Sequence, residues 1–395
     1  MNKLSFLLFV AGLSPTLAAV ELSGSASVQL RAFPSSPTSD AQLETEQLSL
    51  ALQPEVYLPW NDGADGFVFS PYLRFDAEDK ERTHGDIREA LWTHAADTWE
   101  LKAGIGRVFW GVTESAHLVD VINQTDLVEN LDGEDKLGQP MLALTRITDG
   151  GTFSVFALPG FRERTFPGSD GRLRSFPVVD TDAVTWESSA EEKHVDAAVR
   201  YSHYFGPIDI GLSHFHGTNR EPDFFPRSGD DPTQPVALAP HYAQMDQTGL
   251  DLQLTMESWI GKVEWIRRET DQETFMAWAA GLEWTVPGIF QTTHDLGFIG
   301  EWLHDERDAE TLFDDDLFLG TRWVWNDVSG TEVLAGVVAD LDDTTEQFWN
   351  LEASRRLNDR WTIEVEWRVF RGLPAGPFAP LNQDDYLQLE VARYF

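Results

Sequence analysis

The sequence contains no cysteine among its 395 residues. Disulfide frameworks, zinc fingers and cysteine nucleophiles are therefore excluded. Positive charge is also scarce, because 29 lysines and arginines stand against 66 aspartates and glutamates and leave a formal net charge of -37. A chain this acidic repels phosphate backbones, so we expect no nucleic-acid partner.

Long apolar runs are missing as well. Mean hydropathy is -0.30, and the short apolar run from Leu4 to Leu13 falls below the roughly 17 residues that a membrane-spanning helix needs. A helical membrane protein is therefore excluded. Together with Lys3 and the small residues Ala18 and Ala19, this run predicts a secretory signal peptide over residues 1–19 and one mature domain over residues 20–395.

What the chain does contain is a repeated period of two. Between residues 20 and 32, apolar or small residues occupy the even positions and mostly polar residues the odd ones, and the segments 67–76 and 361–369 repeat this alternation. Only a β-strand separates side chains in this way. A soluble β-sandwich also alternates, so it remains the structural alternative at this point.

The connections between these segments alternate in length. We identify about 18 segments, with 16 as the alternative count, and tight turns near residues 148–151, 205–207 and 358–359 interleave with long links near 108–138, 159–193 and 217–242. Transmembrane barrels carry long loops on one rim and short turns on the other. The sequence therefore predicts an all-β fold, a transmembrane antiparallel up-and-down barrel whose long links are extracellular.

The last segment, residues 386–395, alternates in the same way and ends on Tyr394 and Phe395. With the signal peptide and the ladder of strands, this ending resembles the Gram-negative outer-membrane β-barrels of the porin-like kind. The resemblance implies an outer-membrane location, contacts with membrane lipid and lipopolysaccharide, and a role for Tyr394 and Phe395 as a signal to the barrel-assembly machinery. It specifies neither a solute nor an oligomeric state.

In each strand, the polar residues that alternate with the apolar ones point to the opposite face, and they are predicted to line the lumen. An acid-leaning lumen favours cations or neutral polar solutes over anions. The alternative is that most of these charges are mutual ion pairs that stiffen the wall. The candidates are Arg74, Asp76, Glu100, Lys102, Arg107, Arg146, Glu264, Arg268, Arg322, Glu364, Glu366 and Arg368.

The link 108–138 is the third long one, and the strand exit before it, residues 104–111, resembles the Gly-Arg exits that precede inward-folding loops in porin-like barrels. Its apolar residues, such as Leu118, recur at roughly helical spacing. One apolar face is expected to pack against the inner wall, while an acidic flap outside the membrane is the equal alternative. The constriction candidates between the apolar positions are His117, Asp120, Asn123 and Asp126.

Motifs for catalysis are few. The sequence has no His-Glu-x-x-His, no Gly-x-Ser-x-Gly and no phosphate-binding glycine loop. His214 and His216 share one strand face, a spacing that suits a metal or an interfacial belt. We therefore predict a channel for passive diffusion of small polar or cationic solutes, with no enzymatic activity, cofactor or metal. The alternatives are a barrel enzyme acting on lipid or polymer, and a barrel that exports or anchors a surface polysaccharide.

Overall fold

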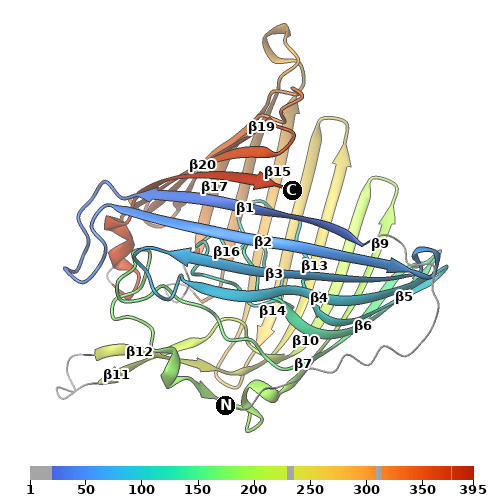
Figure 1. Cartoon of the computed structure of the whole chain (residues 1–395), viewed down its shortest axis with the longest axis horizontal. Helices are drawn as coiled ribbons and strands as arrows, with labels where there is room; N and C mark the ends of the chain where they lie inside the picture. Colours follow the sequence, from blue (N-terminus) through green and yellow to red (C-terminus); the bar gives the residue numbers. More distant parts are fainter. Residues whose placement is uncertain (1–19, 229–234, 308–310, 312, 375) are drawn as a thin grey trace.

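The computed structural model describes residues 20–228, 235–307, 311, 313–374 and 376–395, so the predicted signal peptide lies outside the described residues. Eighteen strands form one antiparallel sheet that closes into a barrel (Figure 1). Each barrel strand pairs with the next one along the chain, and the first strand pairs with the last, from Ser25 opposite Tyr394 to Ala32 opposite Leu387. The predicted all-β barrel and its count of 18 strands are confirmed.

The barrel strands are eight to fifteen residues long, and a small separate sheet comprises three further strands. The barrel strands are β1 (Glu21–Ala32), β2 (Glu46–Trp60), β3 (Asp65–Asp76), β4 (His84–Ala96), β5 (Trp99–Gly106), β6 (Gln139–Thr148), β7 (Gly151–Pro159), β9 (Val195–Phe205), β10 (Ile208–Thr218), β13 (Gln244–Met256), β14 (Trp259–Glu269), β15 (Thr274–Val286), β16 (Asp295–Asp305), β17 (Asp315–Val324), β18 (Glu332–Asp340), β19 (Gln347–Asn358), β20 (Trp361–Arg371) and β21 (Tyr386–Tyr394). The small sheet contains β8 (Thr185–Trp186), β11 (Asp223–Ser228) and β12 (Pro235–Tyr242).

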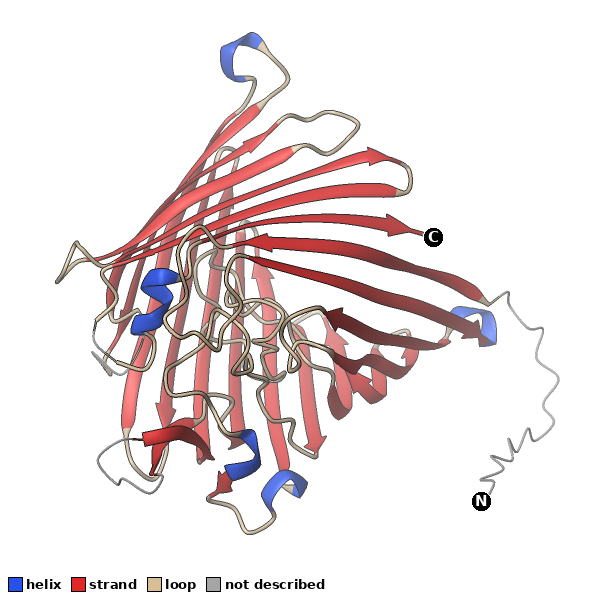
Figure 2. Cartoon of the chain, turned by 60° about the vertical axis from the view of Figure 1, so that its left-hand side comes forward, coloured by secondary structure: helices blue, strands red, loops and turns tan. Residues whose placement is uncertain are grey.

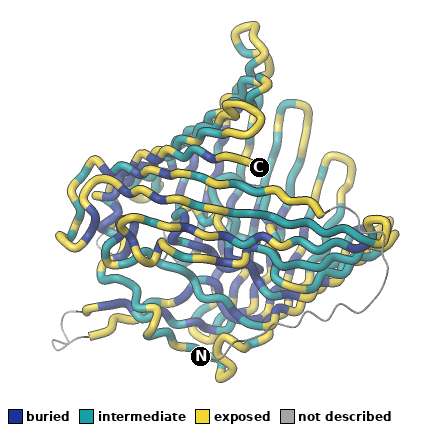
Figure 3. The backbone as a smooth tube through the Cα atoms, in the orientation of Figure 1, coloured by how far each residue is buried: buried dark blue, intermediate teal, exposed yellow. Residues whose placement is uncertain are grey.

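Burial along the strands is the reverse of that in a soluble protein. In β1, the side chains of Gln29 and Arg31 are buried, whereas Val28 and Leu30 are 48% and 40% exposed. Exposed and more buried positions alternate along the strands (Figure 3), and many of the exposed residues are large and apolar, whereas many of the buried ones are polar or charged. A sandwich buries its apolar face against a second sheet. This barrel presents that face to its surroundings, as a lipid-facing wall does.

Aromatic rings gather on the outer face near the rim of short turns. Trp259 and Trp284 stack with their ring centroids 5.4 Å apart, and Phe298 continues the stack. Trp323 and Trp325 form a second stacked pair at 4.8 Å. Such rings are typical of the girdle at a membrane interface, where an apolar body and a polar N–H group are both accommodated.

The long links all leave the opposite rim. Two of them, residues 160–194 and 219–243, carry the small sheet of β8, β11 and β12, which the sequence did not predict. The first of these links also crosses the barrel opening, because Arg172 reaches Asp384 at 2.5 Å and Leu43 donates to the carbonyl of Asp170. None of the described helices has the length and apolar character to span a bilayer.

The link between β5 and β6, residues 107–138, lies inside the barrel, where Figure 2 shows several loops in the interior. Its apolar residues Val119, Val121 and Ile122 are buried against inward-facing side chains of the wall, including Phe215 and Ile266. The helix suggested by their spacing is wrong: residues 107–138 contain turns and bends instead. The reason is that several backbone N–H groups of the link donate to wall carboxylates rather than to carbonyls within a helical turn.

Candidate functional site: the barrel lumen

One wall carboxylate, Glu264 on β14, anchors the first half of the inner link. It is fully covered and accepts hydrogen bonds from the backbone N–H groups of Val112, Thr113 and Val119 at 2.7, 3.1 and 3.1 Å. The hydroxyl of Thr113 donates to it as well, at 2.8 Å. Hydrogen bonds to a buried charged acceptor are stronger than neutral ones, so Glu264 fixes the position of this turn.

A second wall carboxylate, Glu301 on β16, anchors the neighbouring residues. It accepts from the backbone N–H of Glu114 at 2.9 Å and from both the backbone N–H and the hydroxyl of Ser115, at 2.8 and 2.6 Å. Glu301 is buried like Glu264. The turn at residues 112–119 is therefore held from two strands, and its position inside the lumen is set by the wall.

The second half of the link is anchored by Glu129, which receives three polar side chains of β3 and β4. Arg74 approaches it at 2.6 Å, Tyr72 donates its hydroxyl at 2.7 Å, and Nε2 of His84 lies 2.6 Å away. Burial opposes the charged form of Glu129, but the hydrogen bond from His84 and the charges of Arg74 and Arg82 outweigh it and lower the pKa of this carboxyl.

This cluster also contains the group of possible metal ligands found among the described residues. Ligand atoms of His84, Asp126 and Glu129 lie within 4.8 Å of one another. However, the carboxylate of Glu129 already pairs with Arg74, and that of Asp126 pairs with Arg88 at 2.6 Å. Two guanidinium groups thus supply the positive charge that a cation would bring, so the cluster is better suited to ion pairing than to metal binding.

Replacing Glu129 with alanine should destabilise the barrel, because the buried Arg74 would lose its counter-ion. Breaking a buried pair from one side costs about 3–5 kcal/mol. We expect a clear drop in the temperature at which the detergent-solubilised protein loses its folded electrophoretic mobility. Lys80→Ala, which breaks the exposed pair with Asp170, is the control and should leave that temperature unchanged. An unaltered temperature for Glu129→Ala would show that the cluster contributes nothing.

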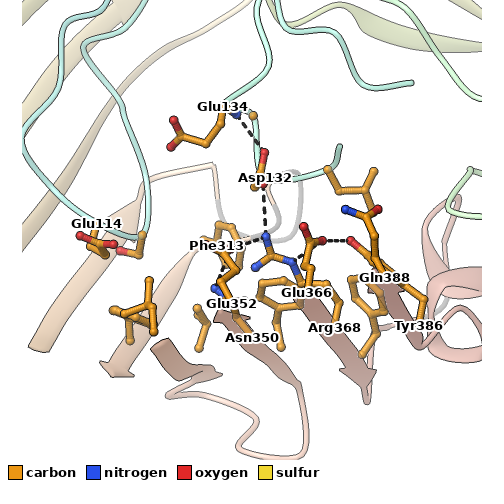
Figure 4. Close-up of a pocket in the computed structure, with 18 of the residues that line it drawn as sticks. Glu114, Asp132, Glu134, Phe313, Asn350, Glu352, Glu366, Arg368, Tyr386 and Gln388 are labelled. Atoms are coloured by element: carbon orange, nitrogen blue, oxygen red, sulfur yellow. Dashed lines mark hydrogen bonds and ion pairs between the residues drawn. The ribbon is translucent and has the colours of Figure 1, made fainter. Parts of the chain in front are cut away.

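The inner link packs on the side of β6–β15 and leaves a cavity of about 820 Å³ against β17–β21. Figure 4 shows this cavity with Glu114, Asp132 and Glu134 of the link on one side and side chains of the strands on the other. Its described lining contains three arginines, Arg164, Arg322 and Arg368, and nine carboxylates. These are Glu114, Asp132, Glu134, Asp316, Glu332, Glu346, Glu352, Glu364 and Glu366.

Two of these arginines are paired with lining carboxylates. Arg322 lies 2.7 Å from Glu114, and Arg368 lies 2.7 Å from Glu352, 3.1 Å from Glu366 and 3.2 Å from Asp132. Within the described part of the chain, four lining carboxylates have no lysine, arginine or histidine at ion-pair distance. They are Asp316, Glu332, Glu346 and Glu364. The cavity therefore carries an excess of negative charge that its own arginines do not neutralise.

The predicted lumen residues fall into two groups. Arg322, Glu364, Glu366 and Arg368 line the cavity. The others on the inward face are engaged by ion pairs or covered by links, as the alternative interpretation expected for much of the set. The pairs are Arg74 with Glu129, Asp76 with Arg82, Glu100 with Lys102, Arg107 with Glu89 and Arg268 with Glu221, while Glu264 holds the inner link.

The placement of Arg146 in the lumen is wrong. Arg146 shares its parity with Leu142 and Leu144, which are about half exposed on the outer face, and it pairs with Trp99 across the strands. It lies near the end of β6, and its guanidinium donates to the hydroxyl of Thr98 beside the short turn. At the edge of an apolar belt a long cationic side chain can reach the polar interface, so an outward arginine is tolerated there.

Among the constriction candidates, only His117 lines the cavity. Its Nε2 lies 2.7 Å from Glu134, and although burial opposes its charge, the hydrogen bonds to Glu134 and Glu264 raise the pKa of His117 to about 10. Asp120, Asn123 and Asp126 are buried and structural: they contact Lys136, the carbonyls of Gly106 and Leu137, and Arg88, respectively.

The link residues that do face the cavity, Glu114, Asp132 and Glu134, were missed as site residues. Asp132 and Glu134 belong to the acidic run 132–135, which the pattern of the sequence alone does not place inside the barrel. Its position directly after the apolar residue Leu131, which packs against a buried cluster of the wall, was the available signal. An anchored apolar residue places the carboxylates beside it at the inner surface.

His214 and His216 lie on the outer face of β10, opposite the parity of the buried Phe215. Both are about half exposed or more, and both approach the carboxylate of Asp246, at 3.5 and 3.0 Å. They face the surroundings of the barrel near the rim of long links. The site described above does not include them.

No protein-family model and no curated protein matches the sequence. Among solved structures, OpdQ from Pseudomonas aeruginosa superimposes with a TM-score of 0.51 at 11% identity, over 95% of this chain and 97% of that one. A mutant of the porin from Rhodopseudomonas blastica superimposes with a TM-score of 0.45 at 10% identity, over 95% and 100%. At this level of identity the similarity concerns the fold, and in fold the chain is a porin-like barrel.

Proposed function

We propose that this protein is a cation-preferring channel of the Gram-negative outer membrane, through which small polar or cationic solutes diffuse passively. The barrel fold and its outward apolar face support the membrane location. The observation on which the selectivity depends is the cavity beside β17–β21, where nine carboxylates stand against three arginines and the protonated His117. Fixed charge of one sign in a narrow pore concentrates counter-ions and repels co-ions.

Purified protein in a planar bilayer tests this function. In about 0.1 M KCl, where the Debye length is about 10 Å, we expect an ohmic current and a preference for K⁺ over Cl⁻ of about tenfold, measured from the reversal potential across a salt gradient. At about 1 M KCl screening shortens to about 3 Å, so the preference should fall strongly. A folded, inserted protein that carries no current would refute the proposal.

Neutralising two unpaired carboxylates separates the role of the cavity from that of the total charge. The double variant Glu332→Gln with Glu364→Gln should reduce the preference for K⁺ while preserving the current. Glu257→Gln, in the short turn between β13 and β14, removes one charge outside the cavity and is the control. Equal effects from both variants would assign the selectivity to net charge alone.

A further inference from the structure

A continuous apolar row crosses the cavity wall. Strand register places Phe318 of β17 opposite Val338 of β18, Val338 opposite Phe348 of β19, and Phe348 opposite Phe370 of β20. The rings of Phe348 and Phe370 lie 5.2 Å apart. All four residues line the cavity, and we refer to them as the apolar row. Phe348 is the partly exposed member of the row, whereas Phe318, Val338 and Phe370 are 4%, 7% and 6% exposed and also belong to apolar clusters of the wall.

Gly336 of β18 lies beneath the ring of Phe318 and keeps this ring from projecting further into the cavity. A Cβ atom on Gly336 would lie 2.3 Å from Cε2 of Phe318, so the ring lies directly over the backbone of the glycine. Any larger residue at this position would force the ring toward the cavity. The wall is thus shaped to present an apolar surface without closing the space in front of it.

Two hydrogen-bond acceptors without partners flank the apolar row. Asp316, one row above Phe318 on β17, is only 4% exposed, and its Oδ2 has no hydrogen-bond partner among the described residues. Asn350 follows Phe348 by two residues on β19, and its Oδ1 also has no hydrogen-bond partner among the described residues. Both line the cavity. A buried acceptor left unpaired costs free energy, which a ligand N–H donor would recover.

The chemistry of a matching ligand follows from these three features. An apolar body suits the row, N–H donors suit Asp316 and Asn350, and a positive charge suits the unpaired carboxylates around them. Aromatic rings also attract cations, and Arg368 already lies 5.6 Å from the centre of the Phe348 ring. We propose that the apolar row and its flanking acceptors form a binding subsite for organic ammonium ions with an apolar body. This proposal depends on the channel function for access and deepens it by naming a solute class.

Current block by three matched small molecules tests the subsite. Benzylammonium combines charge with a ring, benzyl alcohol has the ring alone, and methylammonium has the charge alone. In a bilayer held in dilute KCl, we expect benzylammonium to reduce the K⁺ current at a concentration about tenfold lower than either of the others. Block by benzyl alcohol at the same concentration as benzylammonium would overturn the proposal in favour of a site for neutral apolar solutes. Block by methylammonium at the same concentration would show that charge alone is recognised, and would overturn it as well.

Two variants test whether benzylammonium blocks the current by binding at the apolar row. Phe348→Leu keeps an apolar side chain but removes the ring, and Asp316→Asn removes the charge from the flanking acceptor. Each should weaken block by benzylammonium about three- to tenfold. Phe153→Leu changes a ring on the outer face and is the control, with unaltered current and block. Unaltered block in both test variants would place the ligand elsewhere in the pore and overturn the subsite.

Direct binding distinguishes failure of the subsite from failure of the channel. Saturation-transfer NMR of benzylammonium with the detergent-solubilised protein reports binding without any current, and Phe348→Leu corrects for partition into the detergent. A K⁺ current with no selective binding overturns the subsite and leaves the channel standing. Selective binding with no current retains the subsite and refutes the channel.

Discussion

Replacing Glu264 and Glu301 together with glutamine should open the lumen. The two carboxylates accept eight hydrogen bonds from residues 112–119, and a glutamine at each position keeps one oxygen but turns an N–H₂ group toward backbone donors. We expect each substitution to cost the docked link about 2 kcal/mol, so that the pair shifts the ratio of docked to undocked link about a thousandfold.

The measurement is the single-channel conductance, which should rise and become noisier as the link leaves the wall. Limited proteolysis supplies an independent readout, because the released link should become accessible to cleavage. Glu100→Gln alters a wall carboxylate whose ion pair is with Lys102 on its own strand, and it serves as the control. If the folded double variant retains both the original conductance and the original protection, Glu264 and Glu301 do not hold the link.

The second large effect is a loss of cation preference on acidification from pH 8 to pH 5. Enclosure and the neighbouring carboxylates Glu366 and Glu134 raise the pKa of Asp132 to about 6, against the charge of Arg368 and the hydrogen bond from the N–H of Glu134. Enclosure and the nearby Glu129 and Asp132 likewise raise the pKa of Asp135 to about 7.

These raised pKa values determine in which direction the cation preference changes with pH. At pH 8 both link carboxylates are largely ionised and add to the negative field, whereas at pH 5 both are largely neutral. The folded state also holds these protons more tightly than the unfolded chain, so both groups reduce its stability as the pH rises from about 4 to about 7. We therefore expect the preference for K⁺ over Cl⁻ to fall most steeply between pH 7 and pH 6.

Asp132→Asn should remove the lower part of this transition and reduce the preference at pH 8. Asp342→Asn, on the exposed link between β18 and β19, is the control and should leave the pH profile unaltered. A preference that stays constant down to pH 5 in the unmodified protein would exclude these link carboxylates as a source of the selectivity.

The barrel could be predicted from the amino-acid sequence alone. The alternation in segments such as residues 20–32 is a local property of an extended backbone, in which neighbouring side chains point to opposite faces. Short turns such as the one between β6 and β7 fix the register of a hairpin from a few residues. The strand count, the outward apolar face and the acidity therefore followed from local pattern and composition.

Which of the inward side chains meet solvent depends on how the links fold across the lumen. Glu264 and Glu364 have the same charge and the same inward orientation, yet the inner link covers the first and leaves the second facing the cavity. The contact that covers Glu264 joins it to Val112, 152 positions away in the chain. The alternation of apolar and polar residues contains no information on such a contact, because the contact depends on how a long irregular link packs across the lumen.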